Sequence, residues 1–185
     1  YATVTGIALS GGYLAVITDA ATNHIRHYPI GADGVLDIAS GVSMTTDFGE
    51  PEAIAIDGEQ AWIATTEGLI GVDLADPNPG APKYQVSVPG LVDLSGTVDM
   101  QIAAETAYLL NSTYGLIAVD ISTPQTPTLE ALKSLTSVGQ ALAIHGDRAY
   151  VAGGMTTLVA AKIGCGDGTD DGCGDTVGCG DGAPE

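Results

Sequence analysis

Residues 68–77, Gly-Leu-Ile-Gly-Val-Asp-Leu-Ala-Asp-Pro, and residues 115–124, Gly-Leu-Ile-Ala-Val-Asp-Ile-Ser-Thr-Pro, repeat one pattern within a chain of 185 residues. Each copy is a short apolar run that ends in an aspartate and a proline-containing turn. Runs of this length, bounded by turn residues and too short for helical periodicity, predict buried β-strands. Asp73 and Asp120 have a structural explanation, because a carboxylate at the end of a strand can accept backbone N–H groups and close a turn.

The pattern is part of a longer repeating unit. An aromatic residue recurs at Tyr13, Trp62, Tyr108 and Tyr150, at intervals of 49, 46 and 42 residues. Each unit is predicted to contain a first strand (residues 6–10, 53–57, 100–104 and 141–145), a second strand (12–18, 60–66, 106–112 and 148–154) and a third strand (24–30, 68–74, 115–121 and 157–163). The first three units also contain a more polar fourth strand, at residues 41–45, 83–88 and 127–132.

Four short antiparallel strands in a repeat of 42 to 49 residues match the period of a β-propeller blade. The sequence therefore predicts an all-β chain with about four four-stranded blades at residues 1–49, 50–93, 94–136 and 137–163. An irregular acidic Gly/Asp/Cys tail follows at residues 164–185. No fourth strand is expected in the last blade. Either residues 1–4 complete a four-bladed ring, or the blades are part of a larger or assembled ring, since an open sheet edge invites pairing.

The second and third units resemble the LVIVD repeat of extracellular bacterial and archaeal β-propellers. The resemblance rests on residues 68–77 and 115–124, on the prolines Pro82 and Pro127 that follow them, and on a later Ala-Tyr strand. The fourth unit keeps Arg148-Ala-Tyr-Val-Ala152, whereas residues 24–36 of the first unit are more similar to a blade of the lactonase-type propellers. The resemblance covers roughly residues 5–163. It implies a propeller fold and an extracellular setting, but little about activity, because propellers host many functions.

The composition restricts the partners. The chain has 23 Asp and Glu residues against 5 Lys and Arg, a net charge of -18 and a pI of about 4.1. Nucleic acids and anionic membrane surfaces are bound by clustered basic residues, which are lacking here. The sequence contains no run of 18 apolar residues, so we predict no membrane-spanning segment in it. An acidic surface this poor in lysine suits a secreted protein or a high-salt setting, where self-repulsion is screened. We expect an extracellular or cell-surface location, and any signal peptide is expected to have been removed or to lie outside this sequence.

The tail has almost no side chains to pack, so it is expected to be disordered, joined by disulfides or bound to an ion. Asp167, Thr169, Asp171 and Asp175 follow the first half of an oxygen-rich calcium loop, which makes Ca²⁺ the one cofactor that we expect. Gly178 occupies the position of the usual glutamate ligand, and an acidic spacer without bound metal is the alternative.

Three cysteines, Cys165, Cys173 and Cys179, all lie in the tail. Their odd number allows one intramolecular disulfide and leaves one thiol for a second chain or an anchor. The tight Cys-x-x-Cys pairs of zinc and iron–sulfur sites are missing.

No sequence signature of a nucleophile, a metalloprotease helix or a phosphate loop is present. His24 and His27 point to opposite faces of a strand, and His145 lies at a hairpin, so we expect no joint metal site from them. A binding site would lie on the loops that share one end of the blades. There we expect Asp47, Glu52 and Asp93, with Glu50 and Glu67 near them, to attract cations such as Ca²⁺.

Two functions remain open from the sequence. The first is a non-catalytic structural, adhesion or binding module, whose partners are other protein chains, surface polymers or further copies of itself. The alternative is a calcium-dependent lactonase or hydrolase with its site on these loops. Residues 111–113, Asn-Ser-Thr, also form an N-glycosylation sequon.

Overall fold

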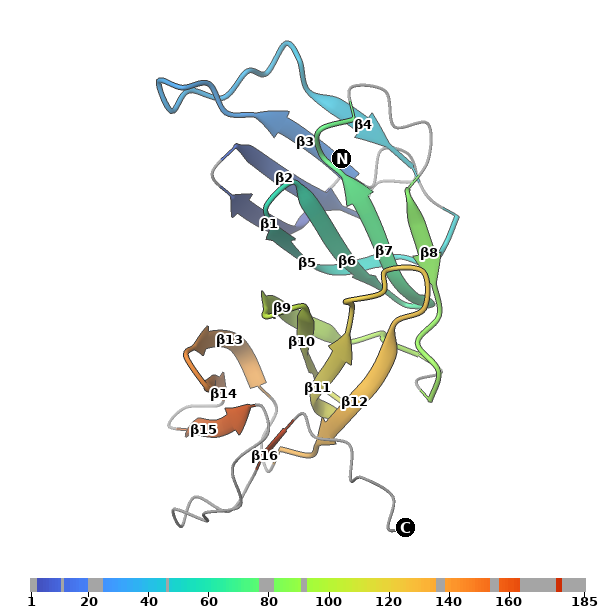
Figure 1. Cartoon of the computed structure of the whole chain (residues 1–185), viewed down its shortest axis with the longest axis vertical. Helices are drawn as coiled ribbons and strands as arrows, with labels where there is room; N and C mark the ends of the chain where they lie inside the picture. Colours follow the sequence, from blue (N-terminus) through green and yellow to red (C-terminus); the bar gives the residue numbers. More distant parts are fainter. Residues whose placement is uncertain are drawn as a thin grey trace.

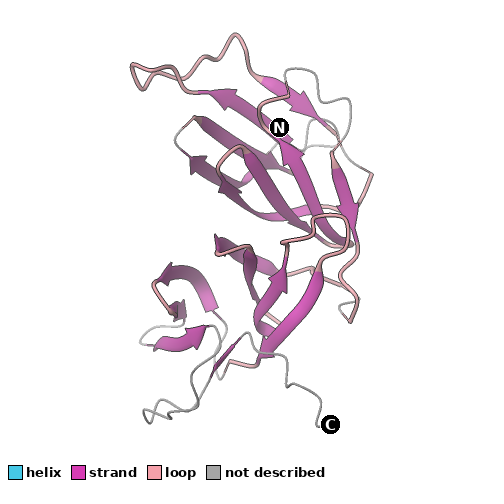
Figure 2. Ribbon diagram, in the orientation of Figure 1, coloured by secondary structure: helices cyan, strands magenta, loops and turns pink. Residues whose placement is uncertain are grey.

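The structure is a computed structural model, which describes residues 3–10, 12–19, 25–45, 47–76, 82–90, 93–135, 139–153, 157–163 and 176–177. The regular elements of these residues are all β-strands (Figure 2). None of the described residues forms a helix with the length and apolarity that a membrane crossing requires.

The strands form four sheets, and each sheet is one blade. Blade 1 contains β1 (Val4–Ser10), β2 (Tyr13–Thr18), β3 (Ile25–Pro29) and β4 (Val42–Met44). Blade 2 contains β5 (Pro51–Asp57), β6 (Gln60–Thr65), β7 (Gly68–Asp73) and β8 (Tyr84–Val86). Blade 3 contains β9 (Thr97–Ala103), β10 (Thr106–Asn111), β11 (Gly115–Asp120) and β12 (Thr128–Lys133). Blade 4 contains β13 (Gly139–His145), β14 (Arg148–Gly153), β15 (Thr157–Ile163) and β16 (Thr176–Val177).

The predicted all-β fold and the strand order within the repeat are confirmed, because each of the first three sheets is an antiparallel meander of four consecutive strands. The expectation of a missing fourth strand in blade 4 was wrong. The short strand β16 takes this place and pairs with β15 in parallel, through Lys162 with Thr176 and Ile163 with Val177. A tail segment reaches this edge from the opposite direction, which the repeat pattern could not predict.

The blades follow one another around a common centre, as in a β-propeller (Figure 1). The first strand of each blade is innermost and lies beside the first strand of the next blade, so that β1 contacts β5, β5 contacts β9 and β9 contacts β13. Val4 pairs with Thr18 at the start of β1. It therefore belongs to blade 1 and does not complete blade 4.

Each blade has two faces, because successive residues of a strand point to opposite sides of the sheet. We call the face toward the previous blade in the chain the preceding face, and the opposite one the following face. From the first strands, the preceding faces contain Ile7 and Leu9, Ile54 and Ile56, Met100 and Ile102, and Leu142 and Ile144. The following faces contain Gly6 and Ala8, Ala53 and Ala55, Asp99 and Gln101, and Ala141 and Ala143.

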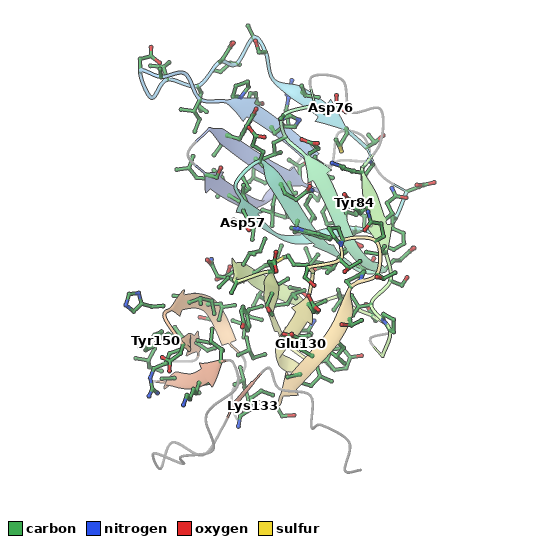
Figure 3. All side chains as sticks on the ribbon, in the orientation of Figure 1. Asp57, Asp76, Tyr84, Glu130, Lys133 and Tyr150 are labelled. Atoms are coloured by element: carbon green, nitrogen blue, oxygen red, sulfur yellow. The ribbon has the colours of Figure 1, made fainter. Side chains whose placement is uncertain are left out.

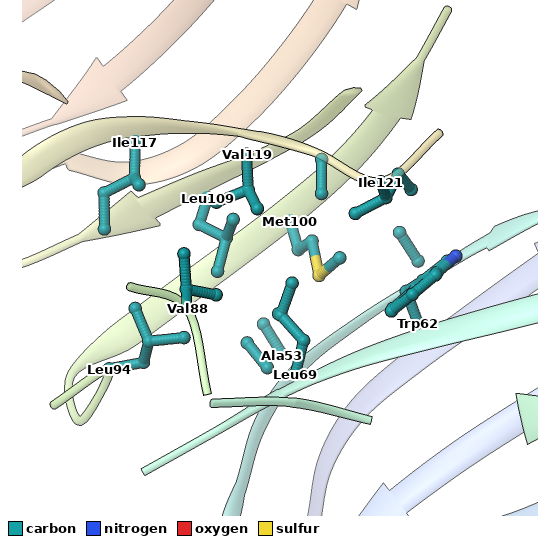
Figure 4. Packing of buried hydrophobic residues seen from close by; sticks show 13 residues of the cluster. Ala53, Trp62, Leu69, Val88, Leu94, Met100, Leu109, Ile117, Val119 and Ile121 are labelled. Atoms are coloured by element: carbon teal, nitrogen blue, oxygen red, sulfur yellow. The ribbon is translucent and has the colours of Figure 1, made fainter. Parts of the chain in front are cut away.

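Three apolar interfaces hold the four blades together, one between each pair of neighbours. The interface between blades 2 and 3 joins Ala53, Trp62 and Leu69 to Met100 and Leu109 (Figure 4). The Trp62 ring also stacks on Tyr84 of β8, with 6.0 Å between ring centroids and an interplanar angle of 14°. Burial of these faces is the main source of stability in this arrangement.

The glycine that opens each copy of the repeated pattern is required by close packing. Gly68 and Gly115 have φ angles of +151° and +85°. A Cβ atom at Gly68 would collide with the Val86 carbonyl oxygen, and one at Gly115 with the Lys133 carbonyl oxygen. Glycine at these positions lets the third strand begin directly against the fourth.

The aspartates at the ends of the third strands close turns, as predicted. The Asp73 carboxylate accepts the Ala75 backbone N–H at 3.1 Å, and the Asp120 carboxylate accepts the Ser122 N–H at 2.8 Å. A hydrogen bond from Lys83 is the main cause that lowers the pKa of Asp73, and hydrogen bonds from Ser122 lower that of Asp120. These carboxylates stabilise the turns in their charged form.

The aromatic repeat is less regular than the sequence suggests. Trp62 pairs with Ala55, two residues into the strand from the hairpin, and Tyr108 and Tyr150 occupy the matching positions. Tyr13 instead pairs with Ser10 at the hairpin itself, and Ala15 occupies the matching position in blade 1. A shift of two residues keeps a side chain on the same face, so the alternating pattern cannot detect it.

Candidate functional site

One end of the blades carries the turns between second and third strands together with the connections between blades, as predicted. We call this end the rim. In blade 2 the Thr66 N–H donates to the Glu50 carbonyl at 3.0 Å, and the Glu50 N–H donates to the Thr66 hydroxyl at 3.1 Å. In blade 3 the Ser112 N–H donates to the Gly96 carbonyl at 2.9 Å. Turn and connection are therefore bonded to each other, which makes the rim a fixed surface.

Glu52 is the predicted site residue with the most distinctive environment. It lies at a β-bulge in β5, between Pro51, which pairs with Thr65, and Ala53, which pairs with Ala64. Burial raises the pKa of the Glu52 carboxyl, and the negative charges of Asp93 and Glu50 raise it further. A hydrogen bond from the Gly96 backbone N–H acts in the opposite direction. The structure thus brings Glu52, Glu50 and Asp93 into electrostatic contact.

Asp93 serves the loop that carries it. Its carboxylate accepts the Ser95 backbone N–H at 2.7 Å and the Ser95 hydroxyl at 2.8 Å, and these bonds lower the pKa of Asp93. Its charge is therefore fixed near Glu52 at neutral pH. Asp47 and Glu67 are also on the described rim, and both are exposed.

Only some of the predicted metal-ligating residues lie in the part of the chain that the structure describes. Asp167, Thr169, Asp171, Asp175 and the three cysteines lie outside the described residues. Within the described ranges, no group of three or more His, Cys, Asp or Glu side chains is placed to hold a metal ion. Glu50, Glu52 and Asp93 on the rim interact through their charges but do not form such a group.

Asn111 is a rim residue whose role the sequence analysis missed. Its side-chain amide is 2% exposed and donates to the Leu94 carbonyl, the Ser95 carbonyl and the Thr97 hydroxyl at 3.1 to 3.3 Å. Its oxygen accepts the N–H groups of Thr113 and Tyr114 at 2.8 and 3.0 Å. The amide nitrogen that a glycan would need is therefore buried and bonded in the folded chain.

Asp99 is the second residue that the sequence analysis missed. One carboxylate oxygen accepts the Met100 N–H of its own strand at 2.8 Å, and the other accepts the Leu142 N–H of blade 4 at 2.7 Å. The matching positions of blades 2 and 4 are alanines, Ala53 and Ala141. Asp99 is thus a polar connection between the first strands of blades 3 and 4.

The histidines have separate environments. His27 is buried in blade 1, where its ring packs edge-on to Tyr13 and neither ring nitrogen has a hydrogen-bond partner. His145 ends β13 and is exposed, and His24 lies outside the described residues. Neither described histidine has a partner group for catalysis.

Comparison with known sequences identifies one of the repeats. A family model described as the LVIVD repeat matches residues 105–132. The chain carries an LVIVD repeat. This repeat spans β10, β11 and most of β12, and it contains the Gly115–Asp120 strand from which the resemblance was drawn. No curated protein matches the sequence significantly.

Solved structures confirm the propeller fold. The computationally designed Ika4 protein is similar with a TM-score of 0.57 at 14% identity, over 88% of this chain and 92% of Ika4. The designed Ika8 protein has a TM-score of 0.60 at 14% identity, over 87% of this chain and 46% of Ika8. The WD40 β-propeller domain of Doa1 has a TM-score of 0.58 at 11% identity, over 87% of this chain and 51% of that one. The chain therefore spans about half the length of Ika8 and of the Doa1 structure.

Proposed function

We propose that this LVIVD-repeat propeller is a non-catalytic binding and structural module that acts at the cell surface or outside the cell, within an extracellular assembly. The observation that carries the proposal is the use of polar groups on the rim. Asn111, Asp93 and Thr66 hold turns and connections in place, and none of them forms part of a nucleophile–base pair. Such a rim is a rigid, negatively charged surface suited to recognition.

The charge of the chain indicates the chemistry of the partner. Glu50, Glu52, Glu67 and Asp93 form the acidic rim, in a protein with a net charge of -18. A basic surface of another protein, or a cationic surface polymer, would be attracted to it and held by groups that need no rearrangement.

An extracellular location is part of the proposal. It is supported by the low lysine content and by the LVIVD repeat, which occurs in extracellular propellers. The cysteines Cys165, Cys173 and Cys179 would then be available for disulfide formation in an oxidising environment. Thiol counting on the purified protein, before and after reduction, tests this part: three free thiols under oxidising conditions contradict it.

Binding of an oligo-lysine peptide at physiological salt tests the recognition surface. The rim variant Glu50→Gln/Glu67→Gln/Asp93→Asn should bind it at least about tenfold more weakly than the wild-type chain. The control Asp57→Asn/Glu59→Gln/Asp147→Asn removes the same charge at the exposed hairpins of the other end, where Asp57 is labelled in Figure 3. This control should change affinity less than about twofold. Equal losses in both variants would show that net charge alone acts, and would contradict a recognition rim.

A calcium-dependent lactonase or hydrolase is the second candidate, and one observation favours it. Burial and the charges of Asp93 and Glu50 disfavour an ionised Glu52, and a bound cation would relieve that penalty. Calcium titration by calorimetry, with lactone and aryl-ester hydrolysis measured at each concentration, separates the two candidates. Hydrolysis that needs both Ca²⁺ and Glu52, and that is lost in Glu52→Gln, would replace the non-catalytic proposal.

A further inference from the structure

The preceding face of blade 1 is open. Ile7 occupies the position on the first strand that Ile54, Met100 and Leu142 occupy in the other blades. Those three residues are 6%, 1% and 5% exposed, whereas Ile7 is 64% exposed. Leu9, two residues along the same face, is 69% exposed. The preceding face is thus buried in blades 2, 3 and 4 and exposed in blade 1.

The following face of blade 4 is open as well. Leu158 occupies the position on the third strand that Ile25, Leu69 and Leu116 occupy in blades 1 to 3. Those residues are fully buried, and Leu158 is 71% exposed. The small residues Ala141, Ala143, Ala152 and Ala160 share this face and are exposed too, next to Tyr150, which Figure 3 labels on blade 4.

On their first strands, the two open faces resemble the two sides of the interface between blades 1 and 2. Between blades 1 and 2, the small residues Gly6 and Ala8 of a following face meet Ile54 and Ile56 of a preceding face. Blade 4 offers Ala141 and Ala143 at the positions of Gly6 and Ala8, and blade 1 offers Ile7 and Leu9 at the positions of Ile54 and Ile56. On the first strands, the open faces therefore continue the internal packing in residue type and in order. On the third strand they differ, because Arg26 stands where Ile70 and Ile117 are buried in blades 2 and 3.

The strands of the end blades differ in charge from those of the inner blades. The strands of blades 1 and 4 contain no acidic residue, although the chain has 23. Three of its five basic residues, Arg26, Arg148 and Lys162, lie on these strands. The strands of blades 2 and 3, in contrast, contain Glu52, Asp57, Asp73, Asp99, Asp120 and Glu130. Neither open face carries an acidic residue on its strands, so the general repulsion between two chains with a charge of -18 is weaker there. The basic residues, Arg26 on the face of blade 1 and Arg148 and Lys162 on the face of blade 4, would lie in the same contact.

We propose that two copies of this chain associate head to tail, with the preceding face of blade 1 of each copy packed on the following face of blade 4 of the other. Both open faces of both chains are then covered, and the ring closes without an exposed end. The inference rests on the proposed function in one respect: it names a second copy of the chain as one partner in the proposed extracellular assembly.

Two substitutions, one on each of the two open faces, test this arrangement. Ile7→Asp places a charge on the preceding face of blade 1, and Leu158→Asp places one on the following face of blade 4. Both positions are exposed in the single chain, so each variant should fold. Ile38→Asp is the matched control, since Ile38 is an apolar residue that is 74% exposed in the connection between β3 and β4. Mass is measured by light scattering coupled to size exclusion at about 100 μM, tenfold above a Kd of about 10 μM. Reductant and chelator are included to exclude disulfides and calcium.

The wild-type chain and Ile38→Asp should have the mass of a dimer, and each face variant alone should be a monomer. An equimolar mixture of Ile7→Asp and Leu158→Asp should recover a dimer, because one intact pair of faces remains between the two variants. A wild-type monomer, an open polymer, a dimer insensitive to both substitutions, or a mixture that stays monomeric overturns the inference. A monomer that still binds oligo-lysine through the rim would overturn this inference and leave the proposed function standing, and a dimer without rim binding would do the reverse.

Discussion

Blades 2 and 3 are covered on both faces, whereas blades 1 and 4 are each covered on one. The four blades share one strand order, yet the exposure of apolar residues at equivalent positions differs from fully buried to more than two-thirds exposed. Leu69, Leu116 and Leu158 are the same residue at the same position, and only Leu158 is exposed. The contrast teaches that the repeat encodes two packing faces per blade, and that the position of a blade in the array decides whether both are used.

The contrast predicts a large difference between identical substitutions in an inner and an end blade. Leu116→Ala removes a fully buried side chain between blades 3 and 4 and should lower the free energy of unfolding by about 2–5 kcal/mol. Leu158→Ala should cost less than about 1 kcal/mol in dilute, monomeric protein. Urea titration of both variants gives the comparison. Equal losses would mean that Leu158 is as buried as Leu116, and would contradict the open face of blade 4.

A buried polar residue of the rim gives a second comparison between an inner blade and an end blade. Asn111 makes five hydrogen bonds from a buried site in blade 3, and the matching residue of blade 4 is Gly153, which has no side chain to bond. Asn111→Ala leaves several backbone groups without partners and should cost about 3 kcal/mol. Ser112→Ala, on an exposed neighbour, should cost less than about 0.5 kcal/mol. Thermal unfolding in parallel checks both values, and a mild loss in Asn111→Ala would show that the rim is not held by this amide.

The junction between an inner and an end blade has its own test. Asp99→Ala leaves the Leu142 N–H of blade 4 without its acceptor and should destabilise the chain by about 1.5–3 kcal/mol. Hydrogen exchange should show faster opening of blade 4 than of blade 2. Uniform acceleration over all blades would contradict a local role in joining blades 3 and 4.

A smaller, pH-dependent effect is expected from His27 in end blade 1, at the position that Gly71 and Ala118 occupy in the inner blades. Burial lowers the pKa of His27 from its ordinary value of 6.5, so the fold favours the neutral ring. The unfolded chain takes up the proton first, and stability that is complete above about pH 6.5 is lost as the pH falls. His27→Leu should unfold at a similar temperature at pH 7.5 and at a higher one than the wild type at pH 5. Parallel wild-type and variant curves between these pH values would refute the effect.

The repeat made the blades predictable, because alternation and turn residues act over a few positions. Glycine, apolar residues and aspartate at fixed spacing located the third strands of blades 2 and 3 nearly to the residue. Asp73 and Asp120 were also assigned correctly, since their hydrogen bonds reach only two residues along the chain. Tyr13 was misplaced by two residues, because the shift changes its distance from the hairpin without changing its face.

The rim was predictable in position and not in detail. The acidic residues Glu52 and Asp93 could be assigned to the correct end of the blades from strand order alone. Asn111 and Asp99 could not be recognised, because their bonds join groups that are 14 to 17 and 43 residues apart. The raised pKa of Glu52 likewise depends on burial at a β-bulge, which no local pattern indicates. The open end faces required exposed fractions, since Ile7, Leu9 and Leu158 are residues of the same kind as their buried counterparts. Arg26, at the position of Ile70 and Ile117, is a local difference that the sequence analysis did not use.

Hydrogen exchange at two protein concentrations tests the central claim most directly, because it reads each blade separately. The inner strands β6, β7, β10 and β11 should be strongly protected at about 1 μM and at about 100 μM. The strands β1, β2, β14 and β15 should exchange faster at the lower concentration and gain protection at the higher one, as the open faces become covered. End blades as protected as inner blades at both concentrations would contradict the claim that the chain leaves one face open at each end.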